Sequence, residues 1–361
     1  MITKRLNINE TSSDNVAEIL SPFFENGTQL EIIGGNTRSF LGGFPEVEAN
    51  IVDFSGFKGI TSYEPSELVI SSRSGTTLNH IQTILSERGQ MLPFEPPQFG
   101  IGSTIGGLVA SGLSGPRRVM HGPVRDHILG IEIIDGRGKL LRFGGKVIKN
   151  VAGFDVSRLL VGSYGTLGMI TEVSIKVLPK PERESTQLFE LDLQSSLDKV
   201  RALNSKPIPV SASTWIDGVL YLRLSGTDDG VRIALAKLGG ETEQNDRATC
   251  FWKNICNLSL PALQNTDRWL WRVSLPGNIK ASALDSVMVD WHGRQRWVLE
   301  ARDDTSIFSK AIELGGHATC FSRDRSSGSG FQPPSGSLGE LNRKVRSVLD
   351  PHFLLNRNKG I

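Results

Sequence analysis

Cysteine is scarce in this chain of 361 residues, which contains three: Cys250, Cys256 and Cys320. An odd and sparse set argues against a disulfide framework. It is also too small for an iron–sulfur cluster held by four thiolates on one chain. We therefore interpret the three cysteines as ordinary small apolar residues and predict no bound metal.

Long apolar runs and a charge excess are missing as well. No stretch approaches the roughly 18 consecutive apolar residues of a membrane helix. Residues Met1 to Glu10 lack the apolar segment and cleavage site of a secretory signal. The 40 basic and 38 acidic residues leave a formal charge of +2, which gives no electrostatic reason to propose nucleic acid. We expect a cytoplasmic protein that does not insert into a membrane and meets one, if at all, through partner proteins.

Glycine, in contrast, is grouped into loops. The segments are Ile33–Thr37, Ile101–Gly112, Lys149–Asp155 and Gly162–Gly168. Glycine lets a backbone approach a ligand closely and turn where a Cβ would clash. Several such loops in one half of a chain favour a long anionic ligand, and a dinucleotide is the natural candidate.

The first two glycine loops each have two interpretations. Gly34–Thr37 follows an apolar strand and would form a nest of N–H groups for an anion, or simply a β-turn. Thr104–Gly112 resembles a helix start whose first turn lacks side chains, where free N–H groups and the helix dipole favour phosphate. The alternative there is tight packing through small residues. The spacing differs from the Gly-x-Gly-x-x-Gly fingerprint of nicotinamide-binding folds.

The order of predicted elements suggests an α+β chain with a boundary near Pro179–Pro181. Before it, apolar periodicity predicts helices over Ser13–Asn26 and Thr77–Arg88, and Asp135–Gly138 predicts a hairpin. After it, two strand–strand–helix passages turn at Asp217–Gly218 and His292–Gly293. The segment Arg323–Gly339 is rich in Ser, Gly, Pro and Arg and predicts a linker. A last helix follows it over 338–349.

The order of these motifs resembles the FAD-linked oxidases of the vanillyl-alcohol oxidase and p-cresol methylhydroxylase type. The motifs are Ile33–Thr37, Thr104–Gly112, Gly162–Gly168 and a terminal Asp350-Pro-x-x-x-x-Asn356. Within that family, Lys146–Arg158 and Asp290–Trp297 are similar to the FAD-binding E subunits of glycolate oxidases. The resemblance implies a PCMH-type FAD-binding domain of two α+β subdomains over 1–182, an α+β cap domain over 183–334, and a C-terminal segment, 335–361, that returns to the FAD domain.

The resemblance also implies where FAD binds: its pyrophosphate on the first loop, its ribityl chain and ring along the second, and its adenine side near Gly165. The residues expected to contact it are Gly34, Gly35, Asn36, Thr37, Arg38, Pro97, Gly102, Ser103, Thr104, Ile105, Gly106, Gly107, Ser111, Gly112, Gly153, Asp155, Gly165 and Ile170. Many relatives attach the flavin through His or Cys near these loops. The first loop has neither, so we predict non-covalent FAD.

The catalytic residues stay unassigned at this point. Relatives that oxidise 2-hydroxy acids usually carry a His-x-Gly-Asp-Gly-Asn-x-His stretch in the cap, and this chain does not. His121 and His127 flank the expected flavin region, but a structural role is the simpler interpretation. Arg117 and Arg118 would clamp a carboxylate, contact a partner or face water. The tryptophans Trp269, Trp271, Trp291 and Trp297 favour core packing over a substrate platform.

The resemblance implies a subunit of a complex that oxidises glycolate to glyoxylate. Its expected partners are a larger FAD-containing glycolate oxidase subunit and an iron–sulfur subunit, and the missing cap histidines suggest that substrate chemistry lies mainly in the larger one. Two alternatives remain: a self-sufficient FAD-linked oxidoreductase for another 2-hydroxy acid such as D-lactate, and a non-catalytic assembly subunit.

Overall fold

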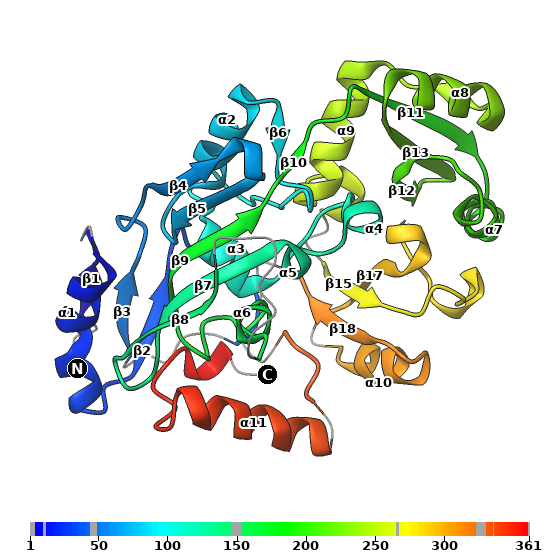
Figure 1. The fold of residues 1–361 in the computed structure, drawn as a ribbon. Coiled ribbons are helices and arrows are strands. Elements are labelled where there is room, and N and C mark those ends of the chain that lie inside the picture. The colour runs from blue at the N-terminus through cyan, green and yellow to red at the C-terminus, as the bar shows by residue number, and fades with distance from the viewer. Residues whose placement is uncertain are drawn as a thin grey trace.

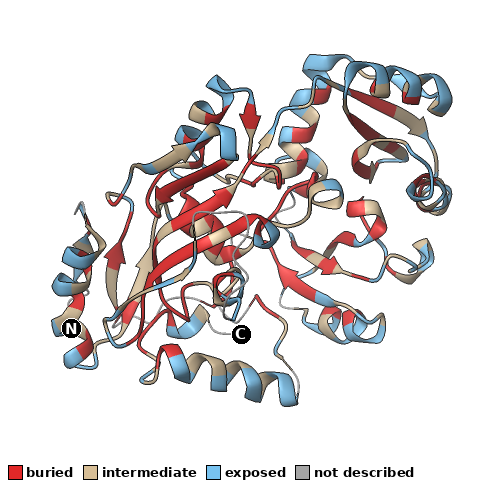
Figure 2. Cartoon of the chain, viewed as in Figure 1, coloured by how far each residue is buried: buried red, intermediate tan, exposed pale blue. Residues whose placement is uncertain are grey.

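The fold, taken from a computed structural model, combines helices with three main β-sheets (Figure 1). The structure describes residues 4–9, 12–43, 49–145, 154–264, 267–302, 304–322, 330–334 and 336–359. Its buried residues gather on the strands and on one side of each larger helix (Figure 2). The mixture agrees with the predicted α+β class.

The N-terminal sheet is parallel and has three strands in the order β1-β3-β2. The strands are β1 (Arg5–Asn7), β2 (Leu30–Ile33) and β3 (Asn50–Asp53). Helix α1 (Ser13–Glu25) joins β1 to β2, and Ser12 caps it by accepting a hydrogen bond from the N–H of Asp14. Its buried Val16, Leu20 and Phe24 pack in the core of this sheet. The packing of α1 against this sheet therefore holds the end of strand β2, at Ile33, where the first glycine loop begins.

A five-stranded antiparallel sheet follows, in the order β4-β5-β9-β7-β8. Its strands are β4 (Ile60–Glu64), β5 (Val69–Arg73), β7 (Ile128–Ile134), β8 (Leu140–Gly144) and β9 (Met169–Lys176). The predicted hairpin is confirmed, because β7 pairs with β8. Helices α2 (Leu78–Glu87) and α3 (Ile105–Ser111) share its apolar core. Short elements complete this half: η1 (Pro65–Glu67), β6 (Gln90–Met91), β10 (Leu178–Pro179), α4 (Arg118–His121), α5 (Val124–His127) and α6 (Val156–Leu159).

The second half of the chain forms one eight-stranded antiparallel sheet, here named the cap sheet, in the order β14-β11-β13-β12-β16-β17-β15-β18. The two predicted strand–strand–helix passages are present, and β12 and β16 join them. Its strands are β11 (Arg183–Glu190), β12 (Val210–Ile216), β13 (Val219–Gly226), β14 (Glu241–Thr242), β15 (Arg268–Ser274), β16 (Met288–Asp290), β17 (Gln295–Ala301) and β18 (His317–Cys320).

Helices α7, α8 and α10 cover the outer face of the cap sheet. Their residues share buried clusters with alternate residues of the strands. Trp269 and Trp271 belong to this outer core, Trp297 points to the opposite face, and Trp291 is also buried, so the core-packing interpretation of the four tryptophans is confirmed. The bounds are α7 (Leu193–Asn204), α8 (Asp228–Leu238), α9 (Asn245–Asn257), η2 (Pro261–Leu263), η3 (Ala281–Ala283), η4 (Trp291–Gly293) and α10 (Ser306–Glu313).

The inner face of the cap sheet lies against the N-terminal half. Met288, Trp297 and Phe321 belong to the same buried cluster as the core of the five-stranded sheet. Helix α9, which the sequence pattern did not predict, contacts β11, and the thiol of its Cys256 donates to the carbonyl of Glu95 at 3.2 Å. The contact between the two halves is therefore part of the same buried apolar cluster as the core of the five-stranded sheet.

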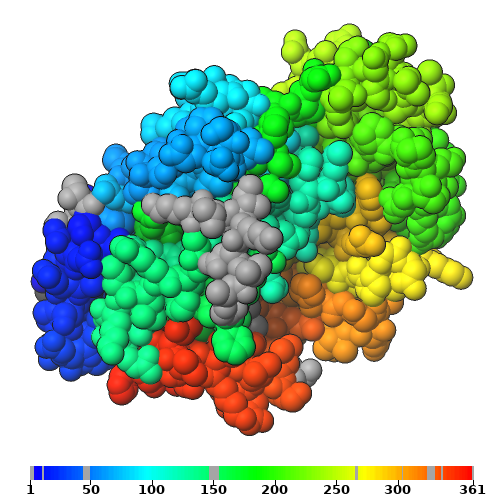
Figure 3. Space-filling view, viewed as in Figure 1, coloured from blue at the N-terminus to red at the C-terminus, as the bar shows by residue number. Residues whose placement is uncertain are grey.

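The C-terminal segment packs beneath the N-terminal half (red in Figure 3). Helix α11 (Ser337–Leu349) contains the whole predicted final helix, 338–349, and is followed by η5 (Arg357–Lys359). The Asp350 carboxylate is fully buried and accepts hydrogen bonds from the N–H groups of Leu354 and Leu355 at 2.9 and 3.0 Å. This turn aligns the tail beside Leu30 of β2. Most of the predicted linker, residues 323–329 and 335, lies outside the described residues.

We expect Asp350→Ala to lower the free energy of unfolding by about 2–4 kcal/mol, because two buried N–H groups lose a charged acceptor. Urea unfolding measures the change. Asp229→Ala removes an exposed aspartate of α8 and serves as the control, with an expected change of less than about 0.5 kcal/mol. Equal effects of the two substitutions would contradict the role given to Asp350.

Candidate functional site

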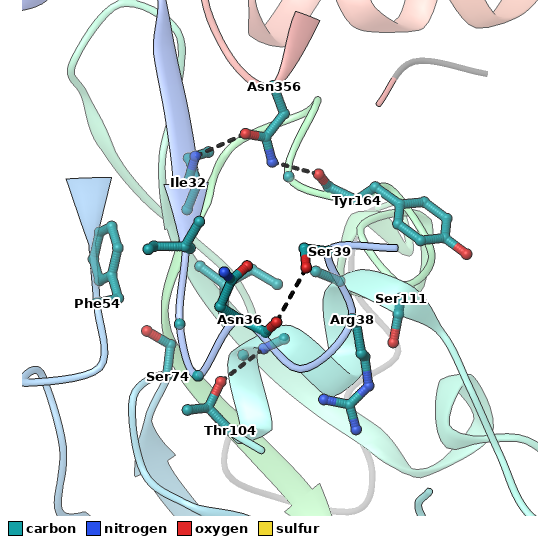
Figure 4. Close-up of a pocket in the computed structure, with 18 of the residues that line it drawn as sticks. Ile32, Asn36, Arg38, Ser39, Phe54, Ser74, Thr104, Ser111, Tyr164 and Asn356 are labelled. Carbon is teal, nitrogen blue, oxygen red and sulfur yellow. Dashed lines mark hydrogen bonds between the residues drawn. The ribbon is translucent and has the colours of Figure 1, made fainter. Parts of the chain in front are cut away.

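A cavity lies where the glycine loops of the N-terminal half meet (Figure 4). Strand β2, helix α3, the loop before β9 and the C-terminal tail supply its walls. The lining residues are Glu31, Ile32, Ile33, Gly34, Gly35, Asn36, Thr37, Arg38, Ser39, Leu41, Phe54, Ser74, Thr104, Gly106, Gly107, Ala110, Ser111, Tyr164, Gly165, Gly168, Ile170, Asn356 and Lys359.

The loop after β2 presents free backbone donors to this cavity. Within the described part of the chain, the five consecutive N–H groups of residues 35–39 donate no hydrogen bond. Asn36 has a φ of 52°, a left-handed conformation that Asn tolerates better than most residues. Successive N–H groups around such a residue form an anion-binding concavity. The nest interpretation of the first glycine loop is therefore favoured over a plain turn.

Close packing of the first two loops explains the adjacent glycines. A Cβ on Gly35 would overlap the carbonyl oxygen of Gly102, and one on Gly34 would lie 2.6 Å from the hydroxyl of Thr104. Neither residue has a positive φ, so the requirement is space rather than backbone conformation. The two loops meet backbone to backbone, which fixes the shape of the cavity floor.

The start of α3 does not offer the free N–H groups that the sequence predicted. The Ile105 and Gly106 N–H groups donate to the carbonyls of Thr76 and Ser74 at 3.0 and 2.9 Å. The Gly107 N–H donates to the hydroxyl of Thr104 at 3.3 Å. The expectation of free N–H groups at this helix start is therefore wrong, because the first turn is already hydrogen-bonded to neighbouring backbone and to its own cap. Contact of this segment with the ribityl chain and ring of FAD stays a prediction.

Arg38 places a positive charge at the cavity. Its guanidinium donates to the carbonyl of Pro97 and to the hydroxyl of Thr37, while its Nε is buried without a partner. Burial lowers the pKa of Arg38 to about 10, a value that still leaves the side chain charged near neutral pH. An orphaned donor on a buried cation suits an anionic ligand.

The opposite wall is fixed by Asn356, which belongs to the terminal Asp350–Asn356 motif but is not among the residues predicted to contact FAD. Its amide accepts from the Ile32 N–H at 2.7 Å and donates to the Tyr164 carbonyl at 2.6 Å. A Cβ on Gly165, whose φ is 76°, would lie 2.6 Å from that amide nitrogen. The terminal motif Asp350-Pro-x-x-x-x-Asn356 is the sequence signal that could have indicated a role for Asn356 in the site.

Eleven of the residues predicted for the site line the cavity: Gly34, Gly35, Asn36, Thr37, Arg38, Thr104, Gly106, Gly107, Ser111, Gly165 and Ile170. The structure does not bring the others to its wall. Pro97 and Gly102 support wall residues, Ser103 and Ile105 are buried, and Gly112 ends α3 with a φ of 64°. Asp155 is exposed and caps α6, and Gly153 lies outside the described residues.

The histidines and arginines near this region have structural partners. The His127 ring contacts the carbonyl oxygen of His121 at 2.7 Å and lies beside Phe94. Arg117 does clamp a carboxylate, that of Glu184 in β11, at 2.6 and 2.7 Å. Arg118 stacks over the Trp291 ring at 4.3 Å. Among the described residues, no group of three or more His, Cys, Asp or Glu could hold a metal ion.

Comparison with known proteins gives close and distant relatives. Residues 8–144 match the family described as FAD binding domain. Glycolate oxidase subunit GlcE of Escherichia coli (strain K12) is 41% identical over 347 residues, which are 95% of this chain and 96% of that protein. Glycolate oxidase subunit GlcD of Bacillus subtilis (strain 168) is 34% identical over 49% of this chain and 37% of its own length.

A solved structure of alkyldihydroxyacetonephosphate synthase has a similar fold. It superposes with a TM-score of 0.67 at 15% identity, over 97% of this chain and 76% of that one. At that identity the likeness concerns the fold alone.

We expect Gly35→Ala to weaken FAD binding roughly 10- to 100-fold, since overpacking costs about 1–3 kcal/mol and would push the two loops apart. Titration of the apoprotein with FAD, followed by flavin fluorescence, measures the affinity. Gly226→Ala is the control, because a Cβ there has ordinary contacts at 3.8 Å or more. Unchanged FAD affinity in folded Gly35→Ala protein would contradict the importance of this contact.

Proposed function

Because the chain belongs to the family of glycolate oxidase subunit GlcE, we propose that it is the FAD-binding subunit of a glycolate oxidase complex, which oxidises glycolate to glyoxylate. The observation that carries the proposal is the row of five unpartnered N–H groups at residues 35–39, beside the buried cation Arg38. Such a row matches a pyrophosphate, which the FAD binding domain family would require.

The lining residues fit FAD. The N–H groups of 35–39 and the Nε of Arg38 would hold the pyrophosphate, and the glycines would let the nucleotide lie against backbone. Ser74 contributes a buried hydroxyl without a partner at the same wall. When bound, FAD supplies the two-electron acceptor for the oxidised carbon. We assign the FAD-binding domain to residues 1–182 and the cap domain to residues 183–334. Residues 335–361 form the C-terminal segment that returns to the FAD-binding domain.

Non-covalent attachment is part of the proposal. None of the described residues that line the cavity is His or Cys, the side chains that relatives of this type use to attach a flavin. The cavity would therefore hold FAD by hydrogen bonds, charge and packing, and acid denaturation would release it.

Partner subunits complete the proposal. GlcE and GlcD are both named as glycolate oxidase subunits, which supports a complex with a larger FAD-containing subunit. The chain has three cysteines, of which one is exposed, and so lacks the four thiolates that hold an iron–sulfur cluster. A cluster that carries electrons onward would therefore lie on a separate iron–sulfur subunit. No helix in the described ranges is long and apolar enough to cross a membrane.

The first test is the visible spectrum of the purified full chain, recorded before and after acid precipitation. We expect about one flavin per chain, recovered in the supernatant as FAD. A colourless protein that cannot be loaded with FAD would contradict the proposal and leave an assembly role. Flavin that stays in the pellet would contradict non-covalent binding alone. Sustained glycolate turnover by this chain without partners would favour the self-sufficient alternative.

A further inference from the structure

Residues 354–359, here named the tail clip, begin beside strand β2. Leu355 forms a parallel bridge with Leu30, and the N–H of Asn356 donates to the carbonyl of Leu30 at 2.9 Å. The Asn356 side chain also accepts from the Ile32 N–H, one residue before the end of β2 (Figure 4). This end of the tail clip is therefore attached to the strand that leads into the first glycine loop.

The other end of the tail clip is attached to the chain that leaves that loop. The ammonium of Lys359 donates to the carbonyl oxygens of Ser39 and Leu41 at 2.6 and 2.8 Å. A Cβ on Gly43 would lie 2.0 Å from the carbonyl oxygen of Asn358, so the clip and the loop meet here without a side chain between them. The first glycine loop therefore lies between two points that the tail clip holds.

The tail clip is hydrogen-bonded within itself and to the helix before it. The Asp350 carboxylate fixes its start, and the Arg346 guanidinium donates to the carbonyl of Leu355 at 2.6 Å. The N–H of Lys359 donates to the carbonyl of Asn356 at 2.9 Å. These bonds keep the two attachment points at a set separation. A loop that is held at both ends loses less conformational freedom when a ligand binds to it.

Lys359 also places a second positive charge at the cavity. The described lining residues include two cations, Arg38 and Lys359, and one carboxylate, that of Glu31. Burial raises the pKa of Glu31, and the charge of Lys359 opposes that effect, so the ammonium acts on charges at this wall. A pyrophosphate carries more than one negative charge, and a second cation suits it better than Arg38 alone.

Lys344 of α11 shows how a surface lysine of the same region differs. Its ammonium pairs with the carboxylate of Glu340 at 2.8 Å, and 72% of its side chain is exposed. Lys359 is half-buried and donates to backbone carbonyls of the loop instead. The position of Lys359 is therefore set by the loop, and the two lysines form a matched pair for experiment.

We propose that the tail clip is a working part of the FAD site. Asn356 and Lys359 are positioning residues, which hold the first glycine loop in the shape that binds the pyrophosphate. The charge of Lys359 adds to the attraction for the pyrophosphate, and release of FAD requires the loop to move against the clip. The proposal rests on the FAD binding given in the proposed function and is independent of the substrate and the partner subunits.

The test measures FAD binding by the full chain through flavin fluorescence. We expect Lys359→Met to raise the Kd for FAD about 10- to 100-fold, since charged hydrogen bonds to the loop are lost. Most of the change should appear as faster release of FAD after dilution. Lys359→Arg keeps the charge and is expected to stay within about threefold of the unsubstituted chain. Lys344→Met is the control and should leave the Kd unchanged.

Salt dependence separates the charge of Lys359 from its positioning role. Salt screens the attraction between a cation and the pyrophosphate, so the Kd should rise between about 0.05 and 0.5 M salt. We expect a smaller rise in Lys359→Met. Asn356→Ala removes the attachment to Ile32 without a change of charge, and should speed the release of FAD with the salt dependence unchanged.

A Lys359→Met chain that binds and releases FAD like the unsubstituted chain would overturn the proposal while the flavin assignment stands. An unchanged salt dependence in that variant would overturn the role of its charge. Unchanged release in folded Asn356→Ala protein would overturn the holding role of the clip. An unsubstituted chain that binds no FAD is a different result, which contradicts the proposed function and this inference with it.

Discussion

The contact on which the rest of the site depends is the backbone-to-backbone packing of the first two glycine loops. Gly34 and Gly35 lie so close to Gly102 and Thr104 that no side chain fits between them. Residues 35–39 line the cavity beside this contact, and their N–H groups donate no hydrogen bond within the described part of the chain. The close approach of the two loops is therefore a consequence of missing side chains, and the anion site that we propose depends on it.

A second constraint sets the position of the cap sheet. Arg223 of β13 pairs with Glu95 at 2.7 and 2.9 Å, and Arg117 pairs with Glu184 of β11. Removing one partner from such a network would leave a buried charge and cost several kcal/mol, on the order of 3–5. The network holds the polar inner face of the sheet opposite the loops of the N-terminal half.

Sequence reasoning succeeded where the signal is local. Helices α1 and α2 lie within their predicted ranges, and the turns at Asp135–Gly138 and Asp217–Gly218 are present. Sequence reasoning failed where contacts with residues distant in sequence determine the hydrogen bonding. The first-turn N–H groups of α3 are taken by carbonyls of Ser74 and Thr76, which no spacing in Thr104–Gly112 could indicate. The ion pairs Arg223–Glu95 and Arg117–Glu184 likewise join residues that are distant in sequence.

The central claim is that FAD binds through the amides of residues 35–39 and not through the start of α3. A crystal structure of the FAD-loaded chain tests it most directly. We expect pyrophosphate oxygens within about 3 Å of several of these amide nitrogens and of the Arg38 side chain. A pyrophosphate placed on the first turn of α3, with its bonds to Ser74 and Thr76 broken, would contradict it.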